Sequence, residues 1–296
     1  MRIGYPCQNL SIPSKFRTCR LQTLINEGKD KIKELSLHNL AELERILHWN
    51  YENNISFFRI SSDMIPFASH EKLSWVWWED EDMIEHLNRI KQLQQSFGLR
   101  LSMHPGQYTI LNSPKKQVVS NALNDLDYHS RFLSFIGGTD MILHTGGAYG
   151  DKEKAKNMFI NEYHSLPDLV KKYLRLENDD KTYDTLDVLS ISEQCGVPVC
   201  FDVHHERCFG SSLEKCASLF NKVKQTWIKE KDKPKVHISS GRDSKSDPAH
   251  ADYIYEDDFD FLMQVLQNTD VDVMVEAKAK ELAVLQINER RNLDDK

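Results

Sequence analysis

Residue types that bind metal ions recur where one short β-rich run after another ends. The runs are LSMH, MILH, LRLE, FDVHH, PKVH and VMVE, and each ends on or beside a histidine or an acidic residue. These residues are His104, His144, Glu177, Asp202, His205, His237 and Glu276. Imidazole and carboxylate groups suit divalent first-row ions such as manganese and zinc. Because the same kind of residue closes six successive runs, the pattern predicts a metal centre.

Two further histidines extend this set. His70 follows the second β-rich run in a loop, and His250 follows the seventh. The nine candidate ligands exceed what one tetrahedral or octahedral ion needs, so two or three ions are expected. Clustered divalent ions activate a water and stabilise both oxygens of an in-line phosphoryl displacement, which favours phosphodiester hydrolysis. Metal-dependent sugar isomerases use a similar scaffold with fewer ligands and are the competing enzyme class.

The elements that must position these residues alternate along the chain. Eight runs are predicted as strands: Arg2–Tyr5, Ser56–Ser61, Leu99–His104, Asp140–His144, Leu174–Glu177, Val197–Val203, Lys235–Ser239 and Val271–Glu276. Apolar residues at helical spacing predict helices at Lys31–Tyr51, Asp82–Phe97, Gln117–Ile136, Lys154–Lys172, Thr185–Gln194, Ser212–Trp227, Phe259–Leu266 and after Lys280. This alternation is typical of an α/β fold with a parallel sheet.

A single (β/α)8 TIM barrel over residues 1–296 is the fold that eight such units favour, and about 250 residues is usual for it. A doubly wound open sheet is the alternative, but GYPC after the first strand lacks its glycine fingerprint. The active site of such a barrel lies at the carboxyl ends of the strands. The last residues, NLDDK, are expected to fray.

The alternation of side chains along a strand separates two faces. If His104 points into the barrel, its neighbour Met103 points toward the helices. Leu143, Leu176 and Val236 stand in the same relation to the ligands that follow them. Packing against helices therefore explains the apolar face, and the polar face needs another purpose, which we take to be metal binding.

Composition sets limits on the partners. The formal net charge of −7 is unusual for a nucleic-acid-binding protein, although bound cations and local basic clusters offset it. The basic residues gather at 152–156, at 229–235 and at 242–245. The six cysteines form no CxxC pair and are expected to be reduced. No run is long enough to span a membrane, and a cytoplasmic location is expected.

Several longer segments resemble the UV damage endonuclease family of the UvdE/UvsE type. They are GYPCQNL at residues 4–10, IPFASH at 65–70, LSMHPGQY at 101–108, HTGGAYG at 144–150, LENDD at 176–180, PKVH at 234–237 and DVMVEAK at 272–278. The resemblance covers nearly the whole chain, and SMHPGQY, LENDD and VMVEAK are its most specific parts.

The resemblance implies a DNA repair activity that spacing alone does not give. Members of this family nick DNA immediately 5′ to cyclobutane pyrimidine dimers and 6-4 photoproducts without ATP, which starts excision repair. They are related to AP endonucleases of the endonuclease IV type, which share the barrel and a three-metal site. By this resemblance, the nine candidate ligands named above hold two to three divalent ions. We expect Mn²⁺ first, with Zn²⁺, Co²⁺ and Mg²⁺ as alternatives.

The resemblance also assigns roles to individual residues. Glu177, Lys235 and His237 are expected to be catalytic. Lys235 matches the family's metal-site lysine; it would face the metals if carboxylated and contact phosphate if not. The expected DNA-binding residues are Tyr5, Asn9, Gln107, Tyr108 and Lys235, with Gln107 and Tyr108 filling the space that flipped bases leave.

Three other functions stay open at this point. An AP endonuclease would share the metals but prefer abasic sites, a sugar isomerase or epimerase would act on a free sugar, and a non-catalytic barrel would only bind damaged DNA. The HPGQY segment favours the first reading, in which the partner is double-stranded DNA containing UV lesions and the protein is a monomer.

Overall fold

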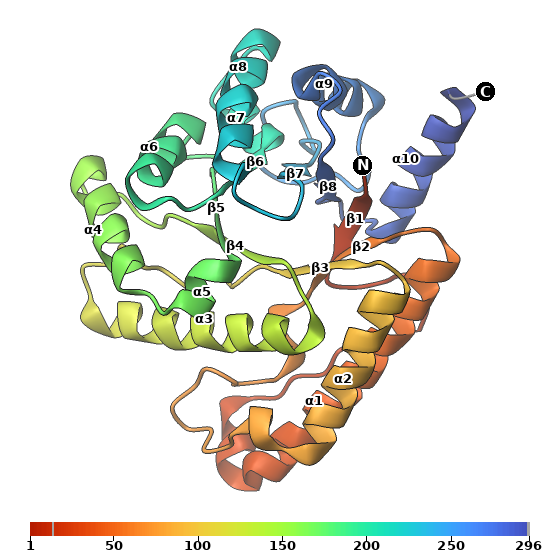
Figure 1. The fold of residues 1–296 in the computed structure, drawn as a ribbon, viewed down its shortest axis with the longest axis vertical. Coiled ribbons are helices and arrows are strands. Elements are labelled where there is room, and N and C mark those ends of the chain that lie inside the picture. The colour runs from red at the N-terminus through yellow and green to blue at the C-terminus, as the bar shows by residue number, and fades with distance from the viewer. Residues whose placement is uncertain (14, 295–296) are drawn as a thin grey trace.

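A computed structural model, which describes residues 1–13 and 15–294, shows eight parallel strands closed into a barrel in chain order (Figure 1). Each strand pairs with its sequence neighbours, and β8 closes the ring on β1. The strands are β1 (Ile3–Pro6), β2 (Phe57–Ile60), β3 (Arg100–Met103), β4 (Asp140–His144), β5 (Leu174–Glu177), β6 (Val199–Asp202), β7 (Lys235–Ile238) and β8 (Asp272–Val275). The predicted (β/α)8 TIM barrel is therefore confirmed.

Helices surround the barrel. They are α1 (Leu21–Glu52), α2 (Glu81–Ser96), α3 (Lys116–Ile136), α4 (Lys152–Ser165), α5 (Asp168–Tyr173), α6 (Thr185–Cys195), α7 (Val203–Cys208), α8 (Leu213–Val223), α9 (Glu256–Leu266) and α10 (Glu281–Asp294). Three short 3-10 turns complete the set: η1 (Ser62–Met64), η2 (Trp77–Glu79) and η3 (Lys224–Trp227). None of these helices is long and apolar enough to cross a membrane.

Three of the differences between the predicted and the observed elements are more than small shifts of their bounds. The helix predicted over Lys154–Lys172 is two helices, α4 and α5, because Pro167 cannot continue the first one. Helix α1 begins at Leu21, ten residues before the predicted start at Lys31, and is kinked at Gly28, where φ is 69°. The one-turn helix α7 directly after β6 was not predicted.

The chain end gives no test of the expected fraying. Residues 292–294 belong to helix α10, and residues 295–296, which the expectation also covers, lie outside the described residues. Helix α10 packs beside β1, so the last helix completes the ring where the first strand begins (Figure 1).

The layer between barrel and helices is apolar, as the strand pattern predicts. Met103, Leu143, Leu176 and Val236 are buried in one continuous hydrophobic core with the inner faces of the helices. Each of them immediately precedes a candidate metal ligand. Because successive strand side chains point to opposite faces, those ligands face the barrel interior.

The amino-terminal end of the barrel interior is filled by paired charges. Arg100 donates to Asp140 (2.9 Å) and to Asp272 (3.0 Å), and Lys235 forms an ion pair with Asp140. All four side chains lie at the start of their strands and are almost completely buried. Pairing offsets part of the cost of removing these charges from water, and it separates this layer from the ligands at the other end.

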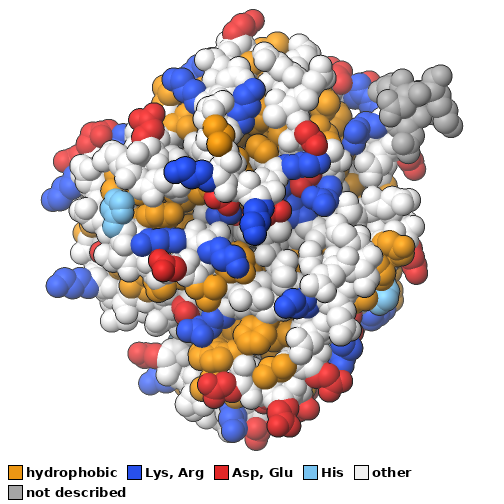
Figure 2. Space-filling view, in the orientation of Figure 1, with side chains coloured by type: hydrophobic (Ala, Val, Ile, Leu, Met, Phe, Trp, Pro, Cys, Tyr) orange, Lys and Arg blue, Asp and Glu red, His pale blue; other side chains and the backbone are white. Residues whose placement is uncertain are grey.

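Charge on the outer surface is unevenly distributed. In Figure 2, basic side chains predominate over the middle of the face shown, and most acidic ones lie around its outline, with a group at the lower edge. A net charge of −7 therefore coexists with locally basic surface. All six cysteines are free thiols in the structure, as expected.

Candidate metal centre

Seven of the nine predicted ligands meet inside the carboxyl-terminal end of the barrel. They come from strand ends or from the residues just after them: His104, His144, Glu177, Asp202, His205, His237 and Glu276. Two overlapping groups of these residues have ligand atoms within 4.8 Å of one another, and Glu177 belongs to both. The parallel register brings this about, because the carboxyl ends of all eight strands open on the same side.

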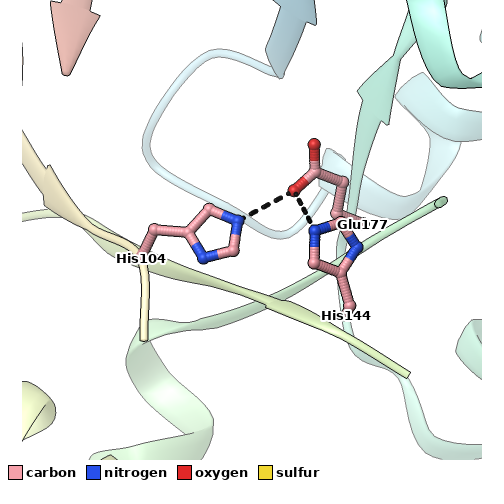
Figure 3. Close-up of side chains that lie close together, drawn as sticks. All are labelled: His104, His144 and Glu177. Carbon is pink, nitrogen blue, oxygen red and sulfur yellow. Dashed lines mark hydrogen bonds and ion pairs between the residues drawn. The ribbon is translucent and has the colours of Figure 1, made fainter. Parts of the chain in front are cut away.

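Glu177, the last residue of β5, lies at the middle of the cluster. Its Oε2 atom is 3.2 Å from Nε2 of His104 and 3.5 Å from Nε2 of His144 (Figure 3). The two imidazoles approach the carboxylate from neighbouring strands β3 and β4. Its other oxygen, Oε1, is 2.7 Å from Nδ1 of His237 on β7. One buried carboxylate thus contacts three imidazoles.

Two more carboxylates and a fourth histidine extend the cluster toward β6 and β8. His237 Nδ1 lies 3.4 Å from Oε1 of Glu276, which follows β8. Asp202, at the end of β6, caps helix α7 by accepting from the backbone N–H of His205 (2.8 Å). This cap turns His205 back over the strand end, with its Nδ1 3.5 Å from the other oxygen of Asp202. Helix α7 is therefore the device that brings His205 into the site.

The two central carboxylates stay ionised. Burial opposes the charge on Glu177, but the imidazoles of His237 and His144 outweigh it and hold the pKa of Glu177 well below its ordinary value. Burial likewise opposes the charge on Glu276, and the guanidinium of Arg59 keeps its pKa low. Both groups are consequently anionic at neutral pH and available to bind a cation.

Burial and the neighbouring carboxylates shift the pKa values of the histidines in different directions. Burial lowers the pKa of His104, so this imidazole is neutral at pH 7 and has a free lone pair. Burial also opposes the charge on His205, but Asp202 and Glu177 raise its pKa to about 9. Without a cation, protons on imidazoles such as His205 balance the carboxylates; a divalent ion bound by the site would replace them.

The donor set fits divalent ions. Among the described residues, three buried atoms of the cluster have no hydrogen-bond partner: Nδ1 of His144, Oδ2 of Asp202 and Nε2 of His237. Buried polar atoms are rarely left in this state without a function. The imidazole of His104 can donate its Nδ1 proton to the backbone oxygen of Pro105 (3.0 Å), which leaves Nε2 as the metal-binding atom.

Two predicted ligands, His70 and His250, are not in contact with this cluster. His70 lies in the loop after η1, where its Nδ1 accepts from the backbone N–H of Lys72 (3.0 Å). The His250 backbone forms an isolated bridge with Gly241, and its ring lies 6.2 Å from that of His204. Both loops are on the side of the barrel where the ligands meet, since they follow the carboxyl ends of β2 and β7. Their role as ligands remains a prediction.

Lys235 lies at the amino-terminal end of the barrel interior. It begins β7, two residues before His237, and its fully buried ammonium is paired with Asp140 at the start of β4. Burial lowers the pKa of Lys235, and Asp140 opposes that effect. In this geometry the unmodified ammonium is directed to Asp140. The expected catalytic role of Lys235 and its contact with DNA stay predictions.

Tyr5 and Asn9 are also buried rather than open to a DNA strand. The Tyr5 hydroxyl donates to Oδ1 of Asn50 (2.6 Å) and accepts from Nδ2 of Asn9 (2.8 Å), and both residues are at most 3% exposed. Burial raises the pKa of the Tyr5 hydroxyl. These contacts anchor the segment after β1 to α1. The place of Tyr5 and Asn9 in a lesion pocket stays a prediction.

Gln107 and Tyr108 do lie at the mouth. They belong to the loop between β3 and α3, and Gln107 lines a cavity of about 310 Å³ together with His104, His144 and Glu276. Tyr108 is 81% exposed, so its ring projects from the loop into solvent. An amide beside the ligands and an aromatic ring above them give the mouth groups that can contact a base.

Sequence reasoning missed two residues that support the site. Arg59, in β2, lines the same cavity and forms an ion pair with Glu276. Asn178 follows Glu177 and exchanges two hydrogen bonds of 2.9 Å with the backbone of Asp202. Arg59 could have been found from the sequence, because it stands between apolar residues in the segment FRI. A guanidinium buried in a strand needs a partner of opposite charge, which indicates a polar site in the barrel.

Comparison with known proteins gives consistent results. A family model described as UV-endonuclease UvdE matches residues 1–295. A protein from Clostridium perfringens strain 13 named UV DNA damage endonuclease is 37% identical over 289 residues, which cover 96% of this chain and 69% of that protein.

Two solved structures resemble this chain to different degrees. The crystal structure of a protein named SacUVDE superposes with a TM-score of 0.88 at 34% identity and covers 99% of both chains. Endonuclease IV from Thermus thermophilus superposes with a TM-score of 0.56 at 13% identity, over 78% of this chain and 86% of that one. The second likeness shows a shared fold and no more.

Proposed function

Because the chain belongs to the UV-endonuclease UvdE family, we propose that it is a UV damage DNA endonuclease. The proposed reaction is ATP-independent hydrolysis of the phosphodiester bond immediately 5′ to cyclobutane pyrimidine dimers and 6-4 photoproducts. The observation that carries this proposal is the buried Glu177 carboxylate among three imidazoles at the barrel mouth, next to a loop with an exposed aromatic ring.

Two or three divalent ions, with Mn²⁺ as the first choice, would be held by the seven clustered residues, joined by His70 and His250. When bound, such ions supply a water of lowered pKa and stabilise the charge that develops on the phosphate oxygens. The mixed imidazole and carboxylate ligation supports a first-row ion.

The chain's own side chains position this chemistry. Glu177 orients the imidazoles of His104, His144 and His237 through its two oxygens. Arg59 holds Glu276 in place and presents a guanidinium to the cavity in which a phosphate would lie. Glu177 and His237 are therefore proposed as catalytic residues. Lys235, which is paired with Asp140 two residues before His237, stays a predicted catalytic and DNA-contacting residue.

Lesion recognition is assigned to the loop that carries Gln107 and Tyr108. A damaged pair of bases stacks poorly and is easier to flip out of the duplex than an intact pair. The exposed ring of Tyr108 can stack in the gap, where one base–aromatic contact contributes about 1–3 kcal/mol. Gln107, lower in the cavity, can donate and accept hydrogen bonds from the unpaired bases.

An AP endonuclease is the second candidate, because the cluster suits phosphodiester hydrolysis at any lesion. The family match and the 34% identity to SacUVDE favour UV photoproducts. A sugar isomerase or epimerase has less support, since it has no need of the loop with Gln107 and Tyr108.

A chromosomal substrate implies the compartment that contains the chromosome, so we place the protein in the cytoplasm and, through DNA, at the nucleoid. Phosphate contacts should make DNA binding weaken steeply with salt despite the net charge of −7. We expect it to act as a monomer, because all nine predicted ligands come from one chain and no partner's residue is needed.

The experiment that tests the proposal uses three end-labelled duplexes of one sequence: undamaged, with a single thymine dimer, and with a single abasic site. Incubation with Mn²⁺ should cut the dimer duplex and leave the undamaged one intact. Cutting of the abasic duplex alone would identify an AP endonuclease. If no duplex is cut, the proposal that DNA is the substrate fails.

A further inference from the structure

One carboxylate on α3 joins the two loops to which the proposed function gives separate tasks. We propose that Asp125 is a positioning residue that holds the loop of His70 and the loop of Tyr108 in one fixed arrangement. Its two partners are Ser69, which directly precedes His70, and Thr109, which directly follows Tyr108.

The geometry divides the carboxylate between the loops. Ser69 Oγ donates to Oδ1 of Asp125 at 3.1 Å, and Thr109 Oγ1 donates to Oδ2 at 2.6 Å. Each oxygen thus serves one loop. A carboxylate is the side chain suited to this task, because it only accepts hydrogen bonds and its two oxygens point in different directions. Hydrogen bonds to a charged acceptor are also stronger than neutral ones.

Further hydrogen bonds fix helix α3 against the segment that follows β2. Tyr128, one turn further along α3, donates from its hydroxyl to the backbone oxygen of Ser62 (2.9 Å) and accepts from the backbone N–H of Ile65 (3.3 Å). Ser62 Oγ donates in turn to the backbone oxygen of His104 (2.6 Å). Helix α3 therefore holds the segment after β2, and that segment holds the strand end that supplies His104.

A cavity of about 370 Å³ lies between these parts and is lined by Phe67, Ser69, Tyr108, Thr109 and Asp125 among others. Without the carboxylate of Asp125, the two loops would border this cavity with no hydrogen bond from that position to either of them. Within α3 the carboxylate has one further contact, with Nδ1 of His129 at 3.6 Å. Its two shorter contacts go to the loops, and an aspartate is otherwise an unfavourable residue in a helix interior.

The consequence rests on the proposed function. His70 is a predicted metal ligand and Tyr108 a predicted lesion-contacting residue, and they are neighbours of the two residues that Asp125 holds. Removing Asp125 should therefore weaken metal binding and lesion binding together, whereas removing either hydroxyl should weaken mainly one of them.

The test uses four variants of the full chain: Asp125→Ala, Ser69→Ala, Thr109→Val and, as a matched control, Asp127→Ala. Asp127 is on the same helix, is 40% exposed and pairs with Arg131 on that helix. The measurements are Mn²⁺ affinity by titration of the metal-free protein, affinity for a dimer duplex by fluorescence anisotropy, and kcat and KM for nicking.

We expect Ser69→Ala to weaken Mn²⁺ binding by about tenfold, in the range usual for groups that support metal ligands, with lesion affinity nearly unchanged. Thr109→Val should raise the KM and the Kd for the dimer duplex by about tenfold and leave kcat and Mn²⁺ affinity unchanged. Asp125→Ala should show both losses, Asp125→Asn smaller ones, and Asp127→Ala neither. Loss of thermal stability in Asp125→Ala without either effect would overturn the proposal.

Limited proteolysis of the metal-free protein separates this proposal from the proposed function. The proposal is supported if a protease cleaves both loops of Asp125→Ala at a concentration that leaves the wild type and Asp127→Ala intact. This result does not depend on which substrate the enzyme uses. Equal resistance of all three proteins would overturn it, even if the wild type nicks dimer duplexes.

Discussion

Glu177 and His237 face each other across the barrel interior, from β5 and β7, with 2.7 Å between Oε1 and Nδ1. The other oxygen of the same carboxylate contacts His104 and His144. Glu177 therefore links the two groups of ligand atoms, and its loss affects both.

Replacing Glu177 by Gln should reduce nicking by at least about 100-fold, since a direct ligand should cost no less than the upper range for supporting residues. The amide keeps the shape of the side chain but removes the negative charge that the imidazoles stabilise. Measurement of bound manganese after dialysis, together with the nicking rate, checks this. The control is Glu193→Gln, at an exposed position of α6, which should match the wild type. Full activity of Glu177→Gln would contradict the site.

Removing the exposed ring of Tyr108 should weaken lesion binding and spare the metal centre. Tyr108→Ala is expected to raise the Kd for a dimer duplex by roughly 5- to 150-fold, which corresponds to about 1–3 kcal/mol of stacking. The stability and manganese content should stay unchanged, because the ring is 81% exposed.

Tyr51→Ala is the control for that change. Tyr51 is 54% exposed and lies near the end of α1, which leads into the amino-terminal end of β2 and therefore to the face opposite the ligands. Anisotropy titrations should show the wild-type Kd for this variant. An equal loss in both variants would mean that Tyr108 has no special role.

The charged layer at the amino-terminal end of the barrel should make the protein sensitive to acid. Burial opposes the charge on Asp140, but Lys235 and Arg100 hold its pKa well below the ordinary value. Such a group stabilises the fold above its unfolded pKa of about 3.9, and this contribution is lost as the pH falls below that value. Urea unfolding of the wild type should therefore show a free energy that falls steadily below about pH 4.

The Asp140→Asn variant isolates this contribution from those of Glu177 and Glu276, which have the same sign. At pH 7 it should be destabilised by about 3–5 kcal/mol, because it leaves the ammonium of Lys235 buried without a counter-charge. Its unfolding free energy should also depend less on pH below 4. Asp257→Asn, whose ion pair with Lys245 is largely exposed, should change stability by less than about 1 kcal/mol. Equal stability of both variants would contradict the role of the layer.

Strand β1 packs so closely on β2 that Gly4 has no room for a side chain. A Cβ at this position would collide with the backbone oxygen of Phe57 and lie 2.6 Å from its backbone carbon, and neither atom can rotate away. Gly4→Ala should cost about 1–3 kcal/mol or more in the free energy of unfolding by urea. Gly106→Ala, where a Cβ would meet nothing within 4 Å, should stay within about 0.5 kcal/mol of the wild type.

The barrel and most of its ligands could be predicted from the sequence for a simple reason. In a closed parallel barrel, every strand end lies on the same face, so polar residues such as His104, His144 and Glu177 at the ends of apolar runs must converge. The strand pattern also assigned the residues before them to the helix layer, where they are found. His205 was predicted as a ligand, but the helical turn that positions it was not.

Other features depend on contacts that strand periodicity does not encode. Lys235 pairs with Asp140, which lies 95 residues away in the sequence. Only the folded barrel shows that both side chains lie at the amino-terminal end of its interior. The hydroxyl of Tyr5 has its hydrogen-bond acceptor, Asn50, on α1, 45 residues further along the chain. His70 and His250 lie in loops, whose conformation is set by tertiary contacts and by any ligand, so their positions could not be read from the strand pattern.

The central claim is that this site hydrolyses DNA immediately 5′ to a UV photoproduct by using divalent ions. The most direct test is to treat a duplex carrying one thymine dimer with chelator-stripped protein, add Mn²⁺ in steps, and map the cut on a sequencing gel. We predict no cut before Mn²⁺ is added and then a single cut directly 5′ to the dimer with an extendable 3′-hydroxyl. A cut that needs no metal, or an intact dimer duplex at saturating Mn²⁺, would contradict the account.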